Sequence, residues 1–420
     1  MKTIQLFHND REAVFLRRPN RFLIIAGHNN EEIPCHCPNP GRLIEFFGFR
    51  GNDIPGAELI LERRQREGGA ANPSRAKTAW TAVGLRYRDS IVPLFSARAN
   101  RAAEELILPR IIGGPVEIHA EFTLGDSRFD FLCIDRQGTR HLVEVKACSL
   151  VEEGVAMFPD APSERALKHL AELAALTKKG YRCHVLFVIV HGKPRRFVPN
   201  LHTDPAFAAA LSDYGAPADP FFPAGGRTAA GTTRTEGKVI IHAALLRCDQ
   251  EGRCRPAAVP VPVDLSHGKL AAADGGNYLV IMELPEPRQT KVGALGIMTF
   301  RAGWYVYAGS ARKNLSKRIN RHLRKTGKRQ HWHIDYLVPL AGKIRALPVR
   351  SCRNLECELA AALAGLKGEP VPRFGASDCR TPGCGSHLYF FPDPPLENRR
   401  FIGMLLRFRH RDALESGDTP

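Results

Sequence analysis

The sequence predicts a multidomain protein that combines α/β and α+β architecture. The chain has 420 residues, which is enough for two or three domains. Residues 129–134 and 141–146 have the pattern of an apolar hairpin, and a helical segment and a buried strand follow them, which is the order expected of an α/β domain. From Asn277 onward, two further apolar strands and a basic helix indicate a separate α+β unit.

The composition favours a polyanionic partner. Lys and Arg number 60 against 43 Asp and Glu, so the formal net charge is +17. Nucleic acid is the expected partner, and an acidic membrane surface is the weaker alternative. No apolar run approaches the ~20 residues that span a bilayer, and the N-terminus carries charges where a signal peptide has an apolar core. We therefore expect a cytoplasmic protein with no membrane partner, whose cysteines are small core residues or metal ligands.

The first predicted domain, residues 1–70, has the pattern of a small β-barrel. Short strand-like runs at 22–27 and 57–64 are separated by Pro, Gly and Asn, as at 37–41.

The second predicted domain, residues 71–268, alternates helix and strand patterns. Residues 98–108 have helical composition, and apolar residues recur at helical spacing over 163–178. The run 183–190 has almost no polar face, which predicts a central buried strand. Residues 216–237, rich in Pro, Gly, Ala and Thr, are predicted to be a loop insertion.

The hairpin of this second domain predicts a metal site. If the polar turn at 135–138 centres the hairpin near Gln137, Asp130 lies opposite Glu144, and Lys146 points to the same face as Glu144. Two carboxylates on an otherwise apolar sheet are costly unless a cation compensates them, so we expect Mg²⁺ or Mn²⁺ there, with Glu121 as a further ligand. The alternative is a surface hairpin whose carboxylates pair with Lys146 and a neighbouring arginine.

The order of Asp130, Glu144 and Lys146 before a helix and a strand resembles the core of PD-(D/E)xK nucleases. There the carboxylates hold Mg²⁺ and the lysine orients the attacking water or stabilises charge. More specifically, residues 1 to about 268 resemble the sugar fermentation stimulation protein A family. The matching stretches are FLRRPNRF (15–22), CHCPNPGRL (35–43), SRFDF (127–131), VEVKACSL (143–150), MFPDAPSER (157–165) and KHLAEL (168–173). This resemblance implies an N-terminal OB-like barrel, a PD-(D/E)xK nuclease-like domain, DNA binding and a loosely defined regulatory link to sugar use.

The first domain also carries arginines interleaved with aromatic residues. Such a pattern suits contacts with a nucleic-acid backbone and stacking on bases, and the alternative is a solvated arginine face. The candidate nucleic-acid-binding residues are Arg17, Arg18, Asn20, Arg21 and Arg42. Cys35 and Cys37 lack a second ligand pair nearby, so we expect them to be structural.

The third predicted domain, residues 277–420, resembles the GIY-YIG nucleases over about 277–392, and more closely an uncharacterised branch of them. The matching stretches are 277–281, 303–310, 314–323, 331–337, 356–360 and 374–379. The first motif is Gly276-Asn277-Tyr278 where the family has Gly-Ile-Tyr, and the second, Tyr307-Ala308-Gly309, has Ala where Ile is usual. The resemblance implies an α+β nuclease-like domain.

The residues of the third domain fit phosphodiester chemistry. Tyr278 or Tyr307 can relay a proton as general base, and Arg318 can stabilise charge on the phosphate. Glu356 is our choice as carboxylate ligand of the metal, with the next acidic residue on the same segment, at 358, second. His322 follows Arg318 by four residues, so on a helix both side chains can face the same cleft.

A strongly basic segment lies between Ala311 and Arg329, with nine Lys or Arg and no acidic residue. A solvated helix face normally mixes charges of both signs, so we expect this segment to contact phosphates. Its candidate nucleic-acid-binding residues are Arg312, Lys313, Lys317, Arg321, Arg324 and Lys325.

The C-terminal half also carries a cysteine-rich cluster. Its spacing allows a structural Zn²⁺ site, and buried free cysteines are the favoured alternative. The cluster comprises Cys352, Cys357, Cys379, Cys384 and His387.

These observations together predict a DNA-binding protein with two nuclease-like modules and Mg²⁺- or Mn²⁺-dependent phosphodiester cleavage by at least one of them. A non-catalytic DNA-binding regulator that retains nuclease folds is the competing hypothesis. RNA processing is the third and less expected one.

Overall fold

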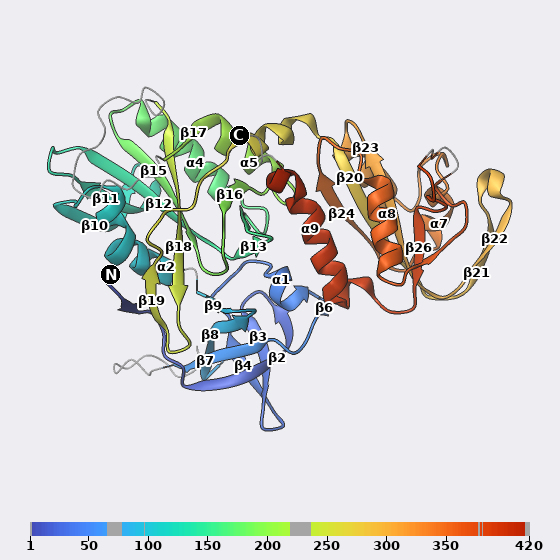
Figure 1. Ribbon diagram of the computed structural model, residues 1–420, viewed down its shortest axis with the longest axis horizontal. Helices are drawn as coiled ribbons and strands as arrows, with labels where there is room; N and C mark the ends of the chain where they lie inside the picture. Colours follow the sequence, from blue (N-terminus) through green and yellow to red (C-terminus); the bar gives the residue numbers. More distant parts are fainter. Residues whose placement is uncertain are drawn as a thin grey trace. The chain divides into compact units, whose positions relative to one another are not determined.

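The computed structural model describes residues 2–64, 78–95, 97–218, 237–376, 379 and 381–415. The chain divides into two compact units, Met1–Lys269 and Leu270–Pro420 (Figure 1). Most of the predicted 216–237 insertion lies outside the described residues. Among the helices that are described, none combines the length and the apolar character that a bilayer crossing requires.

The first unit begins with a five-stranded barrel. The strand order β8-β4-β3-β2-β7 closes on itself because β7 also pairs with β8. This confirms the predicted barrel, but its closing strand β8 follows residue 70, so the barrel extends past the predicted boundary. The barrel strands are β2 (Arg11–Asn20), β3 (Leu23–His28), β4 (Glu31–His36), β7 (Glu58–Arg63) and β8 (Trp80–Tyr87), and the short elements beside them are β1 (Ile4–Gln5), α1 (Ile44–Phe47), β5 (Gly48–Phe49), β6 (Asn52–Asp53) and β9 (Ser90–Pro93).

The rest of the first unit is a mixed sheet with the order β10-β11-β12-β15-β18. β10, β11 and β12 are antiparallel, whereas β12, β15 and β18 run parallel, as a strand-helix-strand crossover requires. The strands are β10 (Glu117–Leu124), β11 (Ser127–Ile134), β12 (Arg140–Cys148), β15 (Arg182–Ile189), β17 (Gly215–Pro217), β18 (Val239–Cys248) and β19 (Arg253–Pro256), and a small second sheet contains β13 (Leu150–Glu152), β14 (Val155–Phe158) and β16 (Arg196–Pro199).

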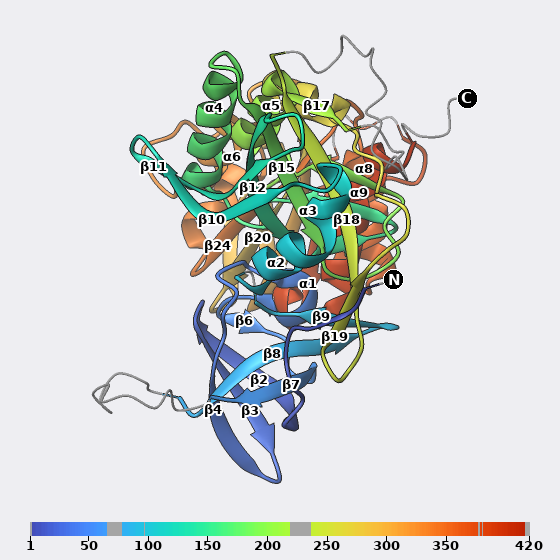
Figure 2. The same cartoon turned by 90° about the vertical axis from the view of Figure 1, so that its left-hand side faces the viewer.

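Helices cover both faces of the mixed sheet, as Figure 2 shows. The helix α4 (Glu164–Thr177) packs Ala166, Leu170 and Leu173 on one face, and Ser163 caps it by accepting a hydrogen bond from the amide of Ala166 at 3.2 Å. The segment that covers the opposite face is α2 (Arg98–Ala102), a π-helical turn (Ala103–Ile107) and α3 (Leu108–Ile111). A further helix, α5 (Pro205–Tyr214), lies beside α4.

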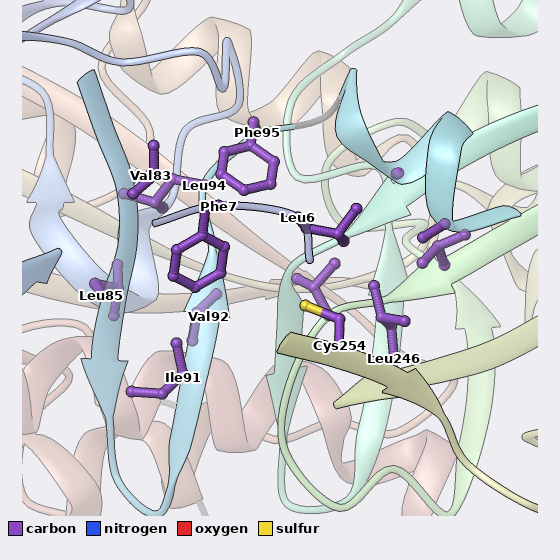
Figure 3. Close-up of a cluster of buried hydrophobic side chains, with 14 of the residues drawn as sticks. Leu6, Phe7, Val83, Leu85, Ile91, Val92, Leu94, Phe95, Leu246 and Cys254 are labelled. Atoms are coloured by element: carbon purple, nitrogen blue, oxygen red, sulfur yellow. The ribbon is translucent and has the colours of Figure 1, made fainter. Parts of the chain in front are cut away.

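The barrel and the mixed sheet share one hydrophobic core. Phe7 and Val92 of the barrel side lie in the same buried cluster as Leu246 and Cys254 of β18 and β19 (Figure 3). Next to it, Cys248 and Cys254 form a disulfide between neighbouring strands. This disulfide was not predicted from the sequence.

Three histidines form a hydrogen-bonded ladder across the parallel strands. His141 Nδ1 lies 3.0 Å from His184 Nε2, and His184 Nδ1 lies 3.0 Å from His242 Nε2. Asp135 begins the ladder, with Oδ2 3.1 Å from His141 Nε2. Burial lowers the pKa of His184 well below its usual value and that of His242 to about 4. The ladder is therefore built from neutral rings.

The second unit is a five-stranded antiparallel sheet in the order β24-β20-β23-β26-β25. α8 and α9 cover one face (Figure 1), while Leu315 of α6 and Ile334 of α7 belong to the core on the other. The elements are β20 (Gly276–Leu284), β21 (Arg288–Lys291), β22 (Ile297–Phe300), β23 (Gly303–Ala311), α6 (Leu315–Leu323), α7 (Ile334–Leu337), β24 (Ile344–Arg350), α8 (Glu356–Gly365), β25 (Glu369–Pro370), β26 (Leu388–Phe391) and α9 (Arg399–Glu415). The α+β architecture predicted for this unit is confirmed.

Candidate functional sites

The hairpin β11–β12 has the predicted register. Phe131 pairs with Val143, and the same register continued by one residue sets Asp130 opposite Glu144. The turn closes as expected, because Asp135 Oδ1 accepts from the amides of Gln137 and Thr139 at 2.9 and 2.8 Å. Two carboxylates therefore lie side by side on a mostly apolar sheet.

Glu144 is a buried carboxylate, 3% exposed, and its two oxygens have different surroundings. Oε1 lies 2.7 Å from His169 Nδ1 and also accepts from Lys146 Nζ. Oε2 is buried, and no described residue donates a hydrogen bond to it. Burial opposes ionisation of Glu144, but His169 and Lys146 outweigh it and hold its pKa below the usual value.

Asp130 is held by groups from two elements. Its Oδ1 accepts from Asn100 Nδ2 of α2 at 2.8 Å, and its Oδ2 accepts from the amide of Val145 at 2.7 Å. Burial, and then the nearby charge of Glu144, raise its pKa above the usual value. A bound cation would relieve both effects.

Glu121 lies opposite Asp130 in the register of β10 and β11, so its role as a metal ligand stays a prediction. Its carboxylate is 69% exposed and lies 3.4 Å from Arg128. His169 and Asn100, which hold Glu144 and Asp130, were not predicted as site residues. A signal for His169 was present, because it lies three residues after Ala166 and four before Leu173, on the buried stripe of its helix.

Arg18, predicted to contact nucleic acid, is instead buried and 4% exposed. Its guanidinium donates to the carbonyls of Gly41, Arg21 and Asn39 at 2.8, 2.8 and 2.7 Å. It therefore ties the 39–42 loop to the barrel and cannot reach a phosphate. This corrects the prediction for Arg18.

The other predicted residues of the barrel are exposed. Arg17 pairs with Glu32 at 2.6 Å. Arg21 stacks over Phe22, whose ring is 52% exposed at the tip of the β2–β3 hairpin. Asn20 and Arg42 lie on the surface as well, and Asn20 Oδ1 accepts from the amide of Phe22 at 2.9 Å.

In the second unit, Tyr278 and His322 form a buried pair with the hydroxyl 2.9 Å from Nε2. Burial raises the pKa of Tyr278, although Arg318 opposes this effect. The pair requires a glycine at 309, because a Cβ there would lie 2.4 Å from Tyr278 Cζ. The Tyr and Gly of the two motifs therefore meet on neighbouring strands.

Arg318 and Glu356 converge on Ser310, at the end of β23. Arg318 donates to the carbonyl of Ser310 at 2.8 Å, and Glu356 Oε2 accepts from the Ser310 hydroxyl at 2.6 Å. The Tyr307 ring lies 6.5 Å from that of Tyr278, centroid to centroid. The structure therefore brings together the five residues predicted for this site.

A fully buried Asp335 organises the basic segment. It accepts from Arg321 at 3.0 and 3.1 Å and from the amides of His331 and Trp332 at 3.0 Å each, and Lys328 Nζ lies 3.1 Å away. Burial opposes ionisation of Asp335, but His322, Arg321 and the two amides outweigh it and hold the pKa of Asp335 well below its usual value. Arg321 is therefore engaged inside the protein, which corrects its prediction as a nucleic-acid contact.

Six basic residues of this segment are exposed and have no carboxylate partner within the described parts of the chain. Lys325 Nζ donates to the carbonyls of Ala341 and Gly342 at 2.5 and 3.0 Å. The six are Arg312, Lys313, Lys317, Arg324, Lys325 and Arg329.

A compact cysteine and histidine cluster lies beside Glu356. The ligand atoms of Cys357, Cys379, Cys384 and His387 all lie within 4.8 Å of one another. Cys352, which the sequence grouped with them, is exposed and is not part of the cluster.

Comparisons with known proteins match three segments of the chain. Residues 16–94 match the SfsA N-terminal OB domain, residues 97–216 the sugar fermentation stimulation protein RE domain, and residues 277–408 the domain of unknown function DUF123. The solved structure of Pyrococcus furiosus SfsA in complex with Ca²⁺ is 24% identical, with a TM-score of 0.48, and the match covers 62% of this chain and 99% of that one.

Two relatives are sugar fermentation stimulation protein homologues. That of Moorella thermoacetica is 36% identical over 220 residues, which are 50% of this chain and 87% of the relative. That of Methanothermobacter thermautotrophicus is 34% identical over 215 residues, 50% of this chain and 83% of the relative. The chain therefore belongs to the sugar fermentation stimulation protein family and carries an additional C-terminal region that matches the domain of unknown function DUF123.

Proposed function

We propose that the protein binds DNA and cleaves its phosphodiester bonds with Mg²⁺ or Mn²⁺ at a site built on Asp130 and Glu144. The observation that carries this proposal is Glu144 Oε2, a buried carboxylate oxygen to which no described residue donates a hydrogen bond. Such an oxygen is costly unless something compensates it. With Asp130 across the hairpin, it offers the carboxylate oxygens that Mg²⁺ and Mn²⁺ prefer.

Each protein group has a distinct role in this proposal. The cation, when bound, would supply charge neutralisation at the phosphate and acidify a bound water. Lys146, adjacent to Glu144, is assigned to orient the attacking water or to offset charge on the phosphate. His169 holds Glu144, and Asn100 holds Asp130, so these two are positioning residues.

We assign DNA contacts to exposed residues of both units. In the first unit, an exposed Phe22 beside Arg21 suits stacking on an unpaired base. Arg17, Asn20 and Arg42 complete this set as contacts to the backbone. In the second unit, the six exposed basic residues of the 312–329 segment suit phosphate contacts.

The test is cleavage of labelled duplex, single-stranded and branched DNA with Mg²⁺ or Mn²⁺. Glu144→Gln should lower the cleavage rate at least about 100-fold, because replacing even an outer-shell partner of a metal ligand costs about 10- to 100-fold. Glu164→Gln, which changes an exposed carboxylate of α4, should match the wild type. Equal rates for Glu144→Gln and the wild type would remove the first site from the reaction. Structured RNA in the same assay tests the RNA alternative.

A second cleavage site in the C-terminal unit is supported by a separate observation. Tyr278, His322, Arg318 and Glu356 lie together at one end of the sheet. Tyr278 with its partner His322 would act as general base, Arg318 would offset charge on the phosphate, and Glu356 would bind the metal. Glu356→Gln should remove this activity and leave that of the first site, with the exposed Glu286→Gln as its control. Activity that survives in Glu144→Gln and disappears in Glu356→Gln would assign cleavage to this unit.

A non-catalytic DNA-binding regulator, here of sugar-metabolism genes, is the second candidate function. It is favoured by the ion pair of Lys146 with Glu144, because the protein's own cations then compensate the carboxylate. It predicts binding that weakens steeply with salt and no metal-dependent product from any of the DNA or RNA substrates.

A further inference from the structure

We propose that Cys357, Cys379, Cys384 and His387 bind one structural Zn²⁺. The Cys357 and Cys379 sulfurs are 3.3 Å apart, and His387 Nε2 lies 3.2 Å from the sulfur of Cys384 and 3.9 Å from that of Cys357. Three thiols and an imidazole nitrogen within 4.8 Å of one another can close on a single ion. Three sulfurs and one nitrogen are a closed structural zinc set, whereas Mg²⁺ takes oxygen ligands.

The four ligands come from separate parts of the unit. Cys357 lies in the first turn of α8, and His387 directly precedes β26. Local turns present the other two, since the amide of Cys379 donates to the carbonyl of Ala376 at 3.2 Å and that of Cys384 to the carbonyl of Thr381 at 3.1 Å. A zinc ion would therefore join α8 to the start of β26 and to the two turns that hold Cys379 and Cys384.

The second nitrogen of His387 gives the site a link to Glu356. Nδ1 lies 3.1 Å from Glu356 Oε1, while Nε2 faces the sulfurs. A histidine that binds zinc through one nitrogen and a carboxylate through the other is a recurrent arrangement that fixes both groups. Since Glu356 Oε2 accepts from Ser310, zinc binding would orient the carboxylate toward the end of β23. Zinc binding itself does not depend on the proposed nuclease function, whereas its effect on Glu356 does.

The first experiment measures metal content. Full-length protein, purified in reducing buffer with added zinc and desalted, should carry about one zinc per chain by elemental analysis. Replacing zinc with Co²⁺ should give the intense sulfur-to-cobalt absorption of a tetrahedral thiolate site. Cys384→Ser should lose both signals, and Cys352→Ser, which changes an exposed cysteine outside the cluster, should keep both.

A second measurement needs no variant, so a folding defect of Cys384→Ser cannot obscure the result. In the wild type, alkylation should spare Cys357, Cys379 and Cys384 until a chelator is added, whereas Cys352 should react at the same rate in both conditions. Substoichiometric zinc, a cobalt spectrum without thiolate bands, or a Cys357–Cys379 disulfide found by mass spectrometry under reducing purification would each overturn the proposal.

The link to Glu356 is tested separately from the zinc site. In the zinc-loaded protein, Glu356→Gln should keep the metal but release it faster to a chelator, by about 10-fold, as expected for a lost contact to a ligand. Release at the wild-type rate would overturn the link. Stoichiometric zinc in a protein that cleaves no substrate would leave the zinc site standing and refute only the nuclease proposal.

Discussion

Acidification should selectively weaken the mixed sheet of the first unit through its histidine ladder. In the neutral ladder His242 donates to His184, His184 donates to His141, and His141 donates to Asp135, so His141 and His184 each donate one hydrogen bond and accept one. A proton added to His184 would turn its acceptor nitrogen into a donor aimed at a neighbouring ring. Protonation therefore costs both a hydrogen bond and the burial of a charge.

The size of the stability loss follows from His242, because burial lowers the pKa of this histidine to about 4. In the unfolded chain its pKa is about 6.5, so between these values the unfolded state binds more protons than the folded state. The stability contribution is then fully present above about pH 6.5 and is lost as the pH falls toward about 4. At pH 5 the loss from His242 is at most about 2 kcal/mol, because partial exposure of the ring reduces it. The stability contribution of His184 changes with pH in the same direction, because burial also lowers the pKa of His184.

The assay is pulsed hydrogen exchange in urea at pH 7 and pH 5, read by mass spectrometry from peptides of β15, so that the first unit is measured alone. The unfolding free energy should fall between the two pH values, and His242→Gln should reduce the fall. His8→Gln, which removes an exposed histidine, should leave it unchanged. A free energy that is constant or higher at pH 5, or an equal fall in the wild type and His242→Gln, would refute the reasoning.

Three further predictions follow from single contacts. Arg18→Ala should destabilise the barrel by about 3 kcal/mol or more in urea unfolding, because it leaves buried carbonyls without a donor. Arg21→Ala, by contrast, should leave the stability unchanged and lower the affinity for single-stranded DNA. Equal unfolding free energies for Arg18→Ala and the wild type would contradict the buried role of Arg18. Gly309→Ala should disrupt the Tyr278–His322 pair, because the new Cβ would lie 2.4 Å from Tyr278 Cζ. NMR should show an altered environment of the Tyr278 ring while β20 and β23 remain paired. An unchanged Tyr278 ring signal would argue against the close approach. Replacing the six exposed cations of the 312–329 segment with Gln should make the logarithmic salt slope of duplex binding shallower by about 5, as expected for six phosphate contacts at about 0.9 each. An unchanged slope would mean that this segment does not bind phosphates.

Local geometry could be predicted from the sequence wherever a single turn, or the spacing of apolar residues along one helix or strand, determines it. The Asp130–Glu144 pairing followed from a four-residue turn, because the turn sets the register of every pair after it. Arg17 and Arg18 could not be told apart in the same way. Register shifts between Phe15 and Arg17 and between Arg17 and Asn20 break the strand alternation, so Phe15 and Arg18 are both buried while Arg17 is exposed.

Long-range partners were the part that the sequence could not predict. Asp335 is separated from Arg321 by 14 residues, and a charge count over one segment does not reveal that it neutralises two of the cations. The cysteine cluster is similar, since Cys352 lies close to Cys357 in sequence but only the latter is brought to His387 by α8. Which charges and thiols meet is decided by tertiary packing rather than by spacing.

The core shared by the barrel and the mixed sheet has a consequence for how this chain can be divided. Phe7 and Val92 lie in the same cluster as Leu246 and Cys254 (Figure 3), so a fragment ending near residue 95 would expose that surface to water. A gene truncated there should give insoluble product, while two co-expressed fragments should reassemble. The barrel and the mixed sheet would therefore have to be inherited together as one folding unit.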